Sequence, residues 1–324
     1  MIRHIAGWAA VAALAADVAP VLAQDAWPDR PVRMVVPFQA GSATDSAARV
    51  VGLRMAALLK QPVIIENRVG ASGLIGAEAV VRAAPDGYTI LLGTVSTQSV
   101  SVGLNSKMSF DPARDLAPIG LIGASPYVLV SASRIAAKDL PAFIGEARAQ
   151  PGKLTYASAG NASMANLAAQ LLAYQGGIQL AHIPYKSSAQ SVTDTINGTI
   201  ALQFGSVMPV LPYVKNGTLK ALAVTGAQRL PLLPDVPTVA ESGLPGYRAE
   251  LWMGLFAPRD TPADVLERLS RTLNAALADR EVADSLLGQG IQTSPLDRQA
   301  FAGFVRTETA KWSKVVKDAG ITGE

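Results

Sequence analysis

The chain has 324 residues and a formal net charge of +3, with no basic cluster, which argues against a nucleic-acid partner. It contains no cysteine, so disulfide bonds and thiol chemistry are excluded. A chain of this length usually forms more than one hydrophobic core. Its low content of aromatic and charged residues is typical of a tightly packed α/β protein. We therefore expect two α/β lobes.

The first 23 residues have the layout of a secretory signal peptide. Arg3 precedes an alanine-rich apolar run. The run ends in Val21-Leu22-Ala23, a pattern typical of the end of a signal peptide. We expect cleavage near Ala23 and export to the periplasm. The alternative is a retained membrane anchor, which Asp17 and Pro20 disfavour because they interrupt the apolar run.

Short β-branched runs bounded by Gly, Pro or Asn predict strands, and apolar residues at i, i+3 and i+4 predict helices between them. This alternation indicates a mainly parallel sheet with right-handed crossovers. We expect helices at 48–59 and 164–175, the second closed by Gly176 and Gly177. The predicted strands are 33–38, 63–67, 89–94, 154–158, 199–204 and 219–226.

Two segments are predicted to cross between the lobes. Residues 118–130 form a long apolar stretch broken by Gly and Pro, and a return is expected within 231–258. The C-terminal part has helical patterns. The expected division is a signal peptide at 1–23, one lobe from 24–125 plus 248–324, and a second lobe from 126–247.

The usual catalytic and cofactor motifs are absent. Beyond the signal peptide His182 is the only histidine, so neither a zinc site nor a serine-protease triad is expected. The sequence has no phosphate-binding P-loop, and Gly70, Gly73 and Gly76 do not have dinucleotide-binding spacing. We expect no enzyme activity, no cofactor and no metal.

Two loops link a strand to a helix in the same way, within 37–45 and 156–169. Helix N-termini attract anions through unpaired amides and the helix dipole, so paired loops of this kind can bind a carboxylate without a cationic side chain. The alternative is that their polar residues are ordinary N-caps. The side chains able to donate hydrogen bonds are Ser42, Thr44, Ser158, Asn161 and Ser163.

The segment WPDRPVRMVVPFQAGSATD resembles the mature N-terminus of the Bug-type receptors, the substrate-binding proteins of tripartite tricarboxylate transporters. The likeness continues in chain order through QPVIIENRVGASGLIGAEAV, APDGYTILLGT, PGKLTYASAGN, HIPYK and LKALAVTGAQRLPLLPDVPTVAESGLPGY. It implies a type II periplasmic binding protein: two α/β lobes with a ligand cleft between them. The implied function is capture of a small organic carboxylate and its delivery, by a monomer, to membrane permease subunits. The alternative is a sensory receptor of the same fold that signals to a membrane kinase.

The resemblance also implies which residues bind the ligand. His182 and Lys186 are expected near the cleft but not at its centre, and Asp45 is expected to fix its own loop. Compared with relatives, Gln39-Ala40 replaces Pro-Pro, Ser42-Ala43 replaces Gly-Gly, and Gly205-Ser206 replaces Asp-Asn. The implied ligand-binding residues are Phe38, Gly41, Ser42, Thr44, Asp45, Ser96, Thr97, Ser158, Gly160, Asn161, Ser163, Tyr185 and Gly205.

The ligand is expected to lack an amine. An ammonium group needs a carboxylate or several carbonyl acceptors, and Gly205 stands where relatives often have an acid. Glycine is also expected to leave room for ligands of different length. We therefore expect a simple di- or tricarboxylate, or an aromatic acid if Phe38, Tyr185 and Trp252 approach the cleft.

Overall fold

The structure is a computed structural model that describes residues 27–104, 108–132, 135–158, 160, 163–185 and 188–318. The expected signal peptide at 1–23 and two residues of the expected site region, Asn161 and Lys186, lie outside these ranges.

The described elements alternate between strands and helices over most of the chain. The strands are β1 (Val32–Val36), β2 (Val63–Asn67), β3 (Thr89–Thr94), β4 (Leu116–Ala132), β5 (Thr155–Ser158), β6 (Ala181–Pro184), β7 (Leu202–Ser206), β8 (Leu219–Val224), β9 (Glu250–Pro258) and β10 (Gln292–Thr293). The helices are α1 (Ala43–Leu59), η1 (Ala71–Gly73), α2 (Leu74–Val81), η2 (Ser96–Val100), α3 (Ser101–Leu104), α4 (Pro112–Asp115), α5 (Leu140–Ala149), α6 (Met164–Gly176), α7 (Ser188–Ile196), α8 (Val207–Lys215), α9 (Ala263–Leu277), α10 (Arg280–Gly288) and α11 (Arg298–Asp318).

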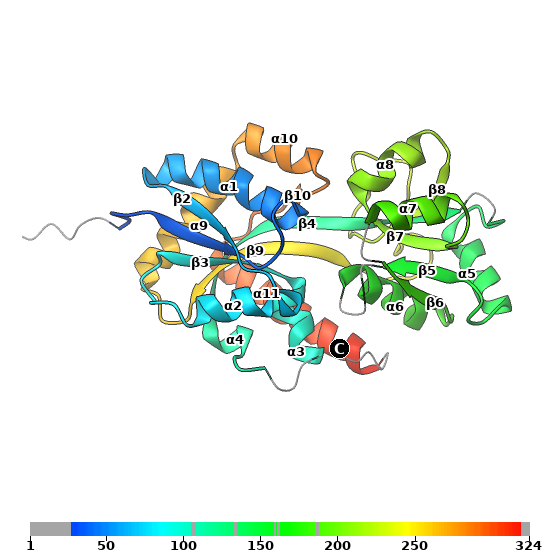
Figure 1. Ribbon diagram of the computed structural model, residues 1–324, viewed down its shortest axis with the longest axis horizontal. Helices are drawn as coiled ribbons and strands as arrows, with labels where there is room; N and C mark the ends of the chain where they lie inside the picture. The colour runs from blue at the N-terminus through cyan, green and yellow to red at the C-terminus, as the bar shows by residue number, and fades with distance from the viewer. Residues whose placement is uncertain are drawn as a thin grey trace, which may run out of the picture.

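Strand β4 joins two halves of the molecule. The strand order is β2-β1-β3-β9-β4-β7-β5-β6, with β8 and β10 also paired to β4. Up to Pro126, β4 pairs with β9 and β10, and from Tyr127 it pairs with β7 and β8. Figure 1 shows β1 to β3 and α1 on one side of this change of partners, and β5 to β8 with α5 to α8 on the other. The strand predicted at 118–130 is thus confirmed, and it extends two residues further at each end.

The predicted helices are confirmed, with one difference in length. Helix α1 begins at Ala43 instead of residue 48, because the Ser42 side chain accepts a hydrogen bond from the Asp45 amide and caps the first turn. Helix α6 ends as expected: Gly177 follows it with φ 60°, the left-handed conformation that glycine adopts at low cost.

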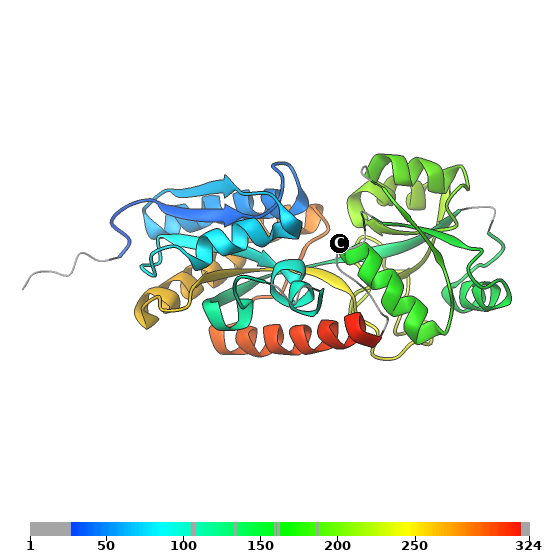
Figure 2. The same ribbon diagram turned by 60° about the horizontal axis from the view of Figure 1, so that its bottom comes forward.

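An aromatic cluster fixes the C-terminal helix against the sheet. Trp252 of β9 packs edge-on against Phe301 and Phe304 of α11, with ring centroids 6.2 and 5.5 Å away. Trp252 is only 1% exposed and belongs to the core, so the condition set for an aromatic acid is not met at this residue. Figure 2 shows α11 lying along one face of the first half, with its end reaching the second. There the Tyr174 hydroxyl lies 3.4 Å from an Asp318 carboxylate oxygen.

Candidate functional site

Strand directions bring two sheet edges face to face. In the first half, β4 and β3 both run antiparallel to β9, so β3 points along β4 toward the second half, as do its parallel partners β1 and β2. In the second half, β7 runs antiparallel to β4, and β5 and β6 run parallel to β7. The carboxyl ends of β1 to β3 therefore face those of β5 to β7.

The separation of these edges follows from the register. Thr94, at the end of β3, lies opposite Met253, which pairs with Gly123 of β4. Ser206, at the end of β7, lies opposite Tyr127. Gly123 and Tyr127 are four positions apart along β4, which corresponds to roughly 13 Å at the usual rise per residue of a strand. Loops at the carboxyl ends of parallel strands are where α/β proteins commonly bind ligands.

The loop after β1 is held by a buried carboxylate. Asp45, whose side chain is 3% exposed, accepts hydrogen bonds from the Gly41 amide at 2.9 Å and from the Asn67 side chain at 2.9 Å. Arg49 approaches the same carboxylate through two nitrogens, at 2.9 and 3.1 Å. The Asn67 side-chain amide also donates to the Phe38 carbonyl. Asp45 therefore fixes its own loop, as expected.

These partners also set the ionisation of Asp45. Burial alone raises the pKa of the carboxyl, but hydrogen bonds from Arg49, Gly41 and Asn67 outweigh burial and hold the pKa below its ordinary value. The group stays ionised at neutral pH, with its oxygens already occupied. Thr44, in the same first turn, is buried at 4% exposure, whereas Gly41 and Ser42 remain at the surface of the loop.

The turn after β2 also lies at this edge of the sheet, but the site predicted from the sequence did not include it. A Cβ at Gly73 would lie 2.7 Å from the Thr97 methyl and 3.3 Å from the Phe38 ring, so loops after β1, β2 and β3 meet here. Ala71 and Ser72 have φ of 46° and 54°, which is strained for residues with a side chain. The glycine-rich spacing of 70–76 was the available signal.

The loop after β3 is a π-helical turn whose predicted binding residue faces inward. Thr97 is fully buried; its hydroxyl accepts from the Thr94 amide at 2.9 Å and donates to the Thr94 carbonyl at 3.2 Å. The Thr97 hydroxyl therefore shapes the turn. Ser96, which precedes it, is partly exposed and is the better placed of the two.

The described contacts of the loop after β5 are between uncharged groups. The Ser163 hydroxyl accepts from the Asn166 amide at 3.2 Å and donates to the Gly160 carbonyl at 2.7 Å. The Ser158 hydroxyl lies 2.6 Å from Nε2 of His182, 3.1 Å from the Gly160 carbonyl and 3.2 Å from the Gly160 amide. Gly160 has φ 111°, a conformation that favours glycine.

His182 is held flat against a tyrosine. Its ring stacks on Tyr156 with centroids 4.9 Å apart, and the Tyr156 hydroxyl donates to Asn166 at 2.5 Å and accepts from Gln170 at 3.0 Å. Burial lowers the pKa of His182 and raises the pKa of Tyr156 to about 12. Both rings are therefore neutral at pH 7 in this structure.

The remaining predicted residues have different surroundings. Tyr185, after β6, donates its hydroxyl to Asp194 at 2.8 Å. Gly205 is buried in β7, and a Cβ there would lie 2.4 Å from Val210 Cγ1. The expectation that Gly205 leaves room for ligand is wrong on this side, because Val210 fills the space.

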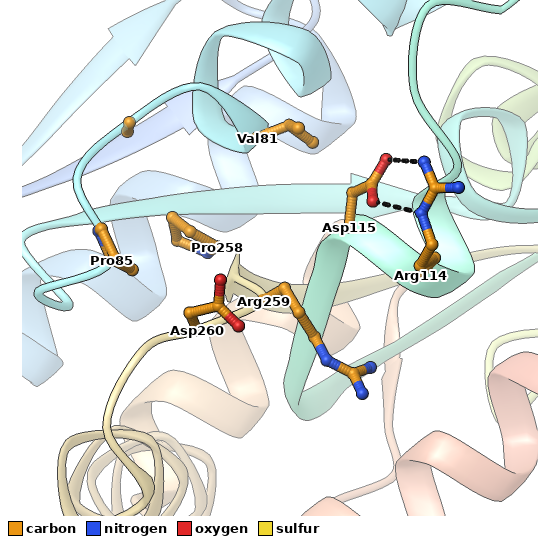
Figure 3. Close-up of a pocket in the computed structure, with 8 residues that line it drawn as sticks. Val81, Pro85, Arg114, Asp115, Pro258, Arg259 and Asp260 are labelled. Atoms are coloured by element: carbon orange, nitrogen blue, oxygen red, sulfur yellow. Dashed lines mark hydrogen bonds and ion pairs between the residues drawn. The ribbon is translucent and has the colours of Figure 1, made fainter.

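A separate pocket of about 360 Å³ lies at the opposite end of the first half. Figure 3 shows Arg114 and Asp115 paired by two hydrogen bonds on its wall, with Arg259 and Asp260 across from them. Leu116 and Pro258, paired at the outer ends of β4 and β9, place this pocket far from the facing edges.

Within the described ranges, no group of three or more His, Cys, Asp or Glu side chains has the arrangement of a metal site. In the same ranges, none of the helices has the length and apolar character needed to cross a membrane. The Ser158–His182 pair has the first two members of a serine-hydrolase triad, but no carboxylate is recorded on the His182 ring among the described residues.

Comparison with known proteins places the chain in a family. Residues 47–321 match the tripartite tricarboxylate transporter family receptor. BugT of Bordetella pertussis is 34% identical over 306 residues, which cover 94% of each chain.

Two solved structures show the same fold. The R. palustris protein Rpa4515 with adipate is 33% identical, with a TM-score of 0.79 over 91% of this chain and 99% of that one. MatC from Rhodopseudomonas palustris with bound malate is 31% identical, with a TM-score of 0.74 over 90% and 100%. The α/β type II architecture and the family expected from the sequence are both confirmed. The chain belongs to the tripartite tricarboxylate transporter receptor family, whose members are solute-binding receptors and not enzymes.

Proposed function

We propose that this protein is an exported receptor that captures a small organic carboxylate between its facing sheet edges and delivers it to a membrane permease of the tripartite type. The observation that carries the proposal is the pair of serine-capped helix starts, Ser42 before α1 and Ser163 before α6, on opposite edges. The relatives with adipate and malate support the same class of ligand.

Uncharged donors are sufficient for such a ligand. A hydrogen bond to a charged group contributes ~1.5–3 kcal/mol, and a partly buried helix N-terminus contributes up to ~2 kcal/mol. Four or five contacts, less the cost of ordering the ligand, reach the roughly −8 kcal/mol of a micromolar complex. Arg49, in the second turn of α1, is bound to Asp45.

The proposed ligand carries no amine. Asp45 is the acidic group of the first loop, and its oxygens already accept from Gly41, Arg49 and Asn67. An ammonium ion would have to displace one of these donors. This argument adds to the one from the missing acid at Gly205; the separate expectation of space for ligands of different length is not supported there, because Val210 fills that space.

Calorimetry with malate, succinate, adipate and aspartate at pH 7 tests both statements. We expect binding of at least one of the three amine-free acids. Failure of all four, together with mass spectrometry showing no copurifying carboxylate, would contradict the receptor proposal. Aspartate bound tenfold tighter than succinate, a difference of ~1.4 kcal/mol, would contradict only the exclusion of amines.

The proposal includes closure of two lobes, 24–125 plus 248–324 and 126–247, around the ligand. The change of partners along β4 between Pro126 and Tyr127 supports this division, since each lobe supplies half of the site. We expect a monomer whose radius of gyration decreases in small-angle scattering when ligand saturates it. We also propose cleavage near Ala23 during export, which N-terminal sequencing of the exported protein checks.

A further inference from the structure

The Ser158 hydroxyl has one hydrogen but lies beside two possible hydrogen-bond acceptors. A serine hydroxyl donates one hydrogen bond and accepts two. The Gly160 amide, 3.2 Å away, donates to it, while the Gly160 carbonyl and Nε2 of His182 lie at 3.1 and 2.6 Å. A bound carboxylate would be one more acceptor for the same single proton.

Among the described partners of Ser158, His182 is the strongest competitor with a ligand for the hydroxyl hydrogen. The Gly160 carbonyl already accepts from Ser163 at 2.7 Å, so it keeps a partner if Ser158 turns away. In the neutral tautomer with its hydrogen on Nδ1, Nε2 at 2.6 Å accepts the hydrogen bond of the Ser158 hydroxyl, which leaves only lone pairs of the hydroxyl to face an anion. A protonated Nε2 donates instead, and the Ser158 proton is then free for a carboxylate.

The surroundings of the ring favour the neutral form until an anion arrives. The described contacts of His182 are with Tyr156 and Ser158, both uncharged at pH 7, and burial lowers the pKa of the imidazole. Lys186 is four positions further along the chain, outside the described residues. A carboxylate bound at Ser158 would bring a negative charge close to the ring, which stabilises the imidazolium.

We propose that His182 is a positioning residue that takes up a proton when a carboxylate binds, and that its Nε2–H directs the Ser158 hydroxyl toward the ligand. This inference rests on the proposed function. Linkage gives its sign: affinity is greatest below the pKa of His182 in the free protein and is lost as pH rises through its higher pKa in the complex. A ring too far from the ligand to sense its charge would produce no such dependence.

The chain offers a direct measurement, because His182 is the only histidine between residues 24 and 324. Its ring resonances can be titrated by NMR in the mature protein, alone and saturated with whichever of malate, succinate and adipate binds tightest. We expect the pKa to rise by about one unit or more, which corresponds to about tenfold tighter binding to the protonated form. An unchanged pKa in the presence of bound ligand overturns the inference.

Variants separate positioning from packing. Wild type should bind the chosen acid more tightly at pH 6 than at pH 8.5, by up to about tenfold. His182→Gln, which keeps an N–H donor but cannot titrate, and His182→Leu should both lose this dependence, with Gln binding more tightly than Leu. Lys186→Met should keep it. A slope that persists in both His182 variants contradicts the inference, and absence of binding at every pH contradicts the proposed function as well.

Discussion

The loops after β1 and β5 have the same framework but different supports. In each, a serine caps the following helix by accepting from the amide three residues on, Ser42 from Asp45 and Ser163 from Asn166, both at 3.2 Å. Behind the first loop lies an ionic network centred on Asp45, whereas the described partners of the second loop are hydroxyls, backbone groups and a neutral imidazole.

The two loops therefore differ in how easily their hydrogen bonds can rearrange. The Asp45 carboxylate keeps its charge across the physiological range, so the first loop is held in one arrangement. The hydroxyl protons of the second loop can rotate between acceptors at little cost, and an imidazole controls one of them. One side of the site is therefore fixed and the other is adjustable.

The largest effect is expected from removing the fixed support. Asp45→Ala should lower the free energy of unfolding by about 2–4 kcal/mol, because buried hydrogen bonds and an ion pair are lost and the Gly41 amide loses its partner. Urea denaturation measures it. As a control, Asp284→Ala removes an exposed i, i+4 pair with Arg280 and should cost less than ~0.5 kcal/mol. Equal losses in the two variants would show that the network does not hold the loop.

The next effect concerns binding by the adjustable side. Ser158→Ala should weaken carboxylate binding by about 1–3 kcal/mol, since a charge-assisted hydrogen bond is lost. Ser163→Ala should weaken it less, because the Ser163 proton is already committed to the Gly160 carbonyl. Calorimetry at pH 7 compares the two. The reverse order would identify Ser163 as the donor to the ligand and Ser158 as structural.

The shared framework predicts a smaller and equal pair of effects. Ser42→Ala and Ser163→Ala each remove an N-cap and should each lower the free energy of unfolding by about 1 kcal/mol. Thermal and urea denaturation of both variants provide the test. A clearly larger loss at Ser42 would mean that the cap and the Asp45 network act as one unit.

The finest comparison is in acid, where Asp45→Asn, which preserves the shape of the side chain but removes its charge, isolates the ionisation of Asp45. Because the folded-state pKa of Asp45 is lowered, its contribution is present above the unfolded value near 4 and is lost as pH falls through the folded value. The variant should therefore lose less stability than wild type as the pH falls below about 4. Identical acid denaturation curves would contradict a lowered pKa.

Much of the framework could be predicted from the sequence because it depends on local geometry. The apolar run at 118–130 marked β4, and Gly177 marked the end of α6. The hydrogen bond from a cap to the amide three residues on is also local, so the serine caps were visible as candidates. The order of motifs along the chain indicated the family.

Only the tertiary structure determines which residues, distant in the sequence, a side chain contacts. His182 lies 24 positions from Ser158, and Asn67 lies 22 from Asp45; sheet register brings each pair together. Local turns also matter: the start of α8 places Val210 over Gly205, and the π-helical turn after β3 directs the Thr97 hydroxyl back to Thr94, neither of which the pattern of residue types predicted. A residue's identity limits which bonds it can form, but strand pairing and packing determine which of them it does form, because those contacts join segments far apart in the chain.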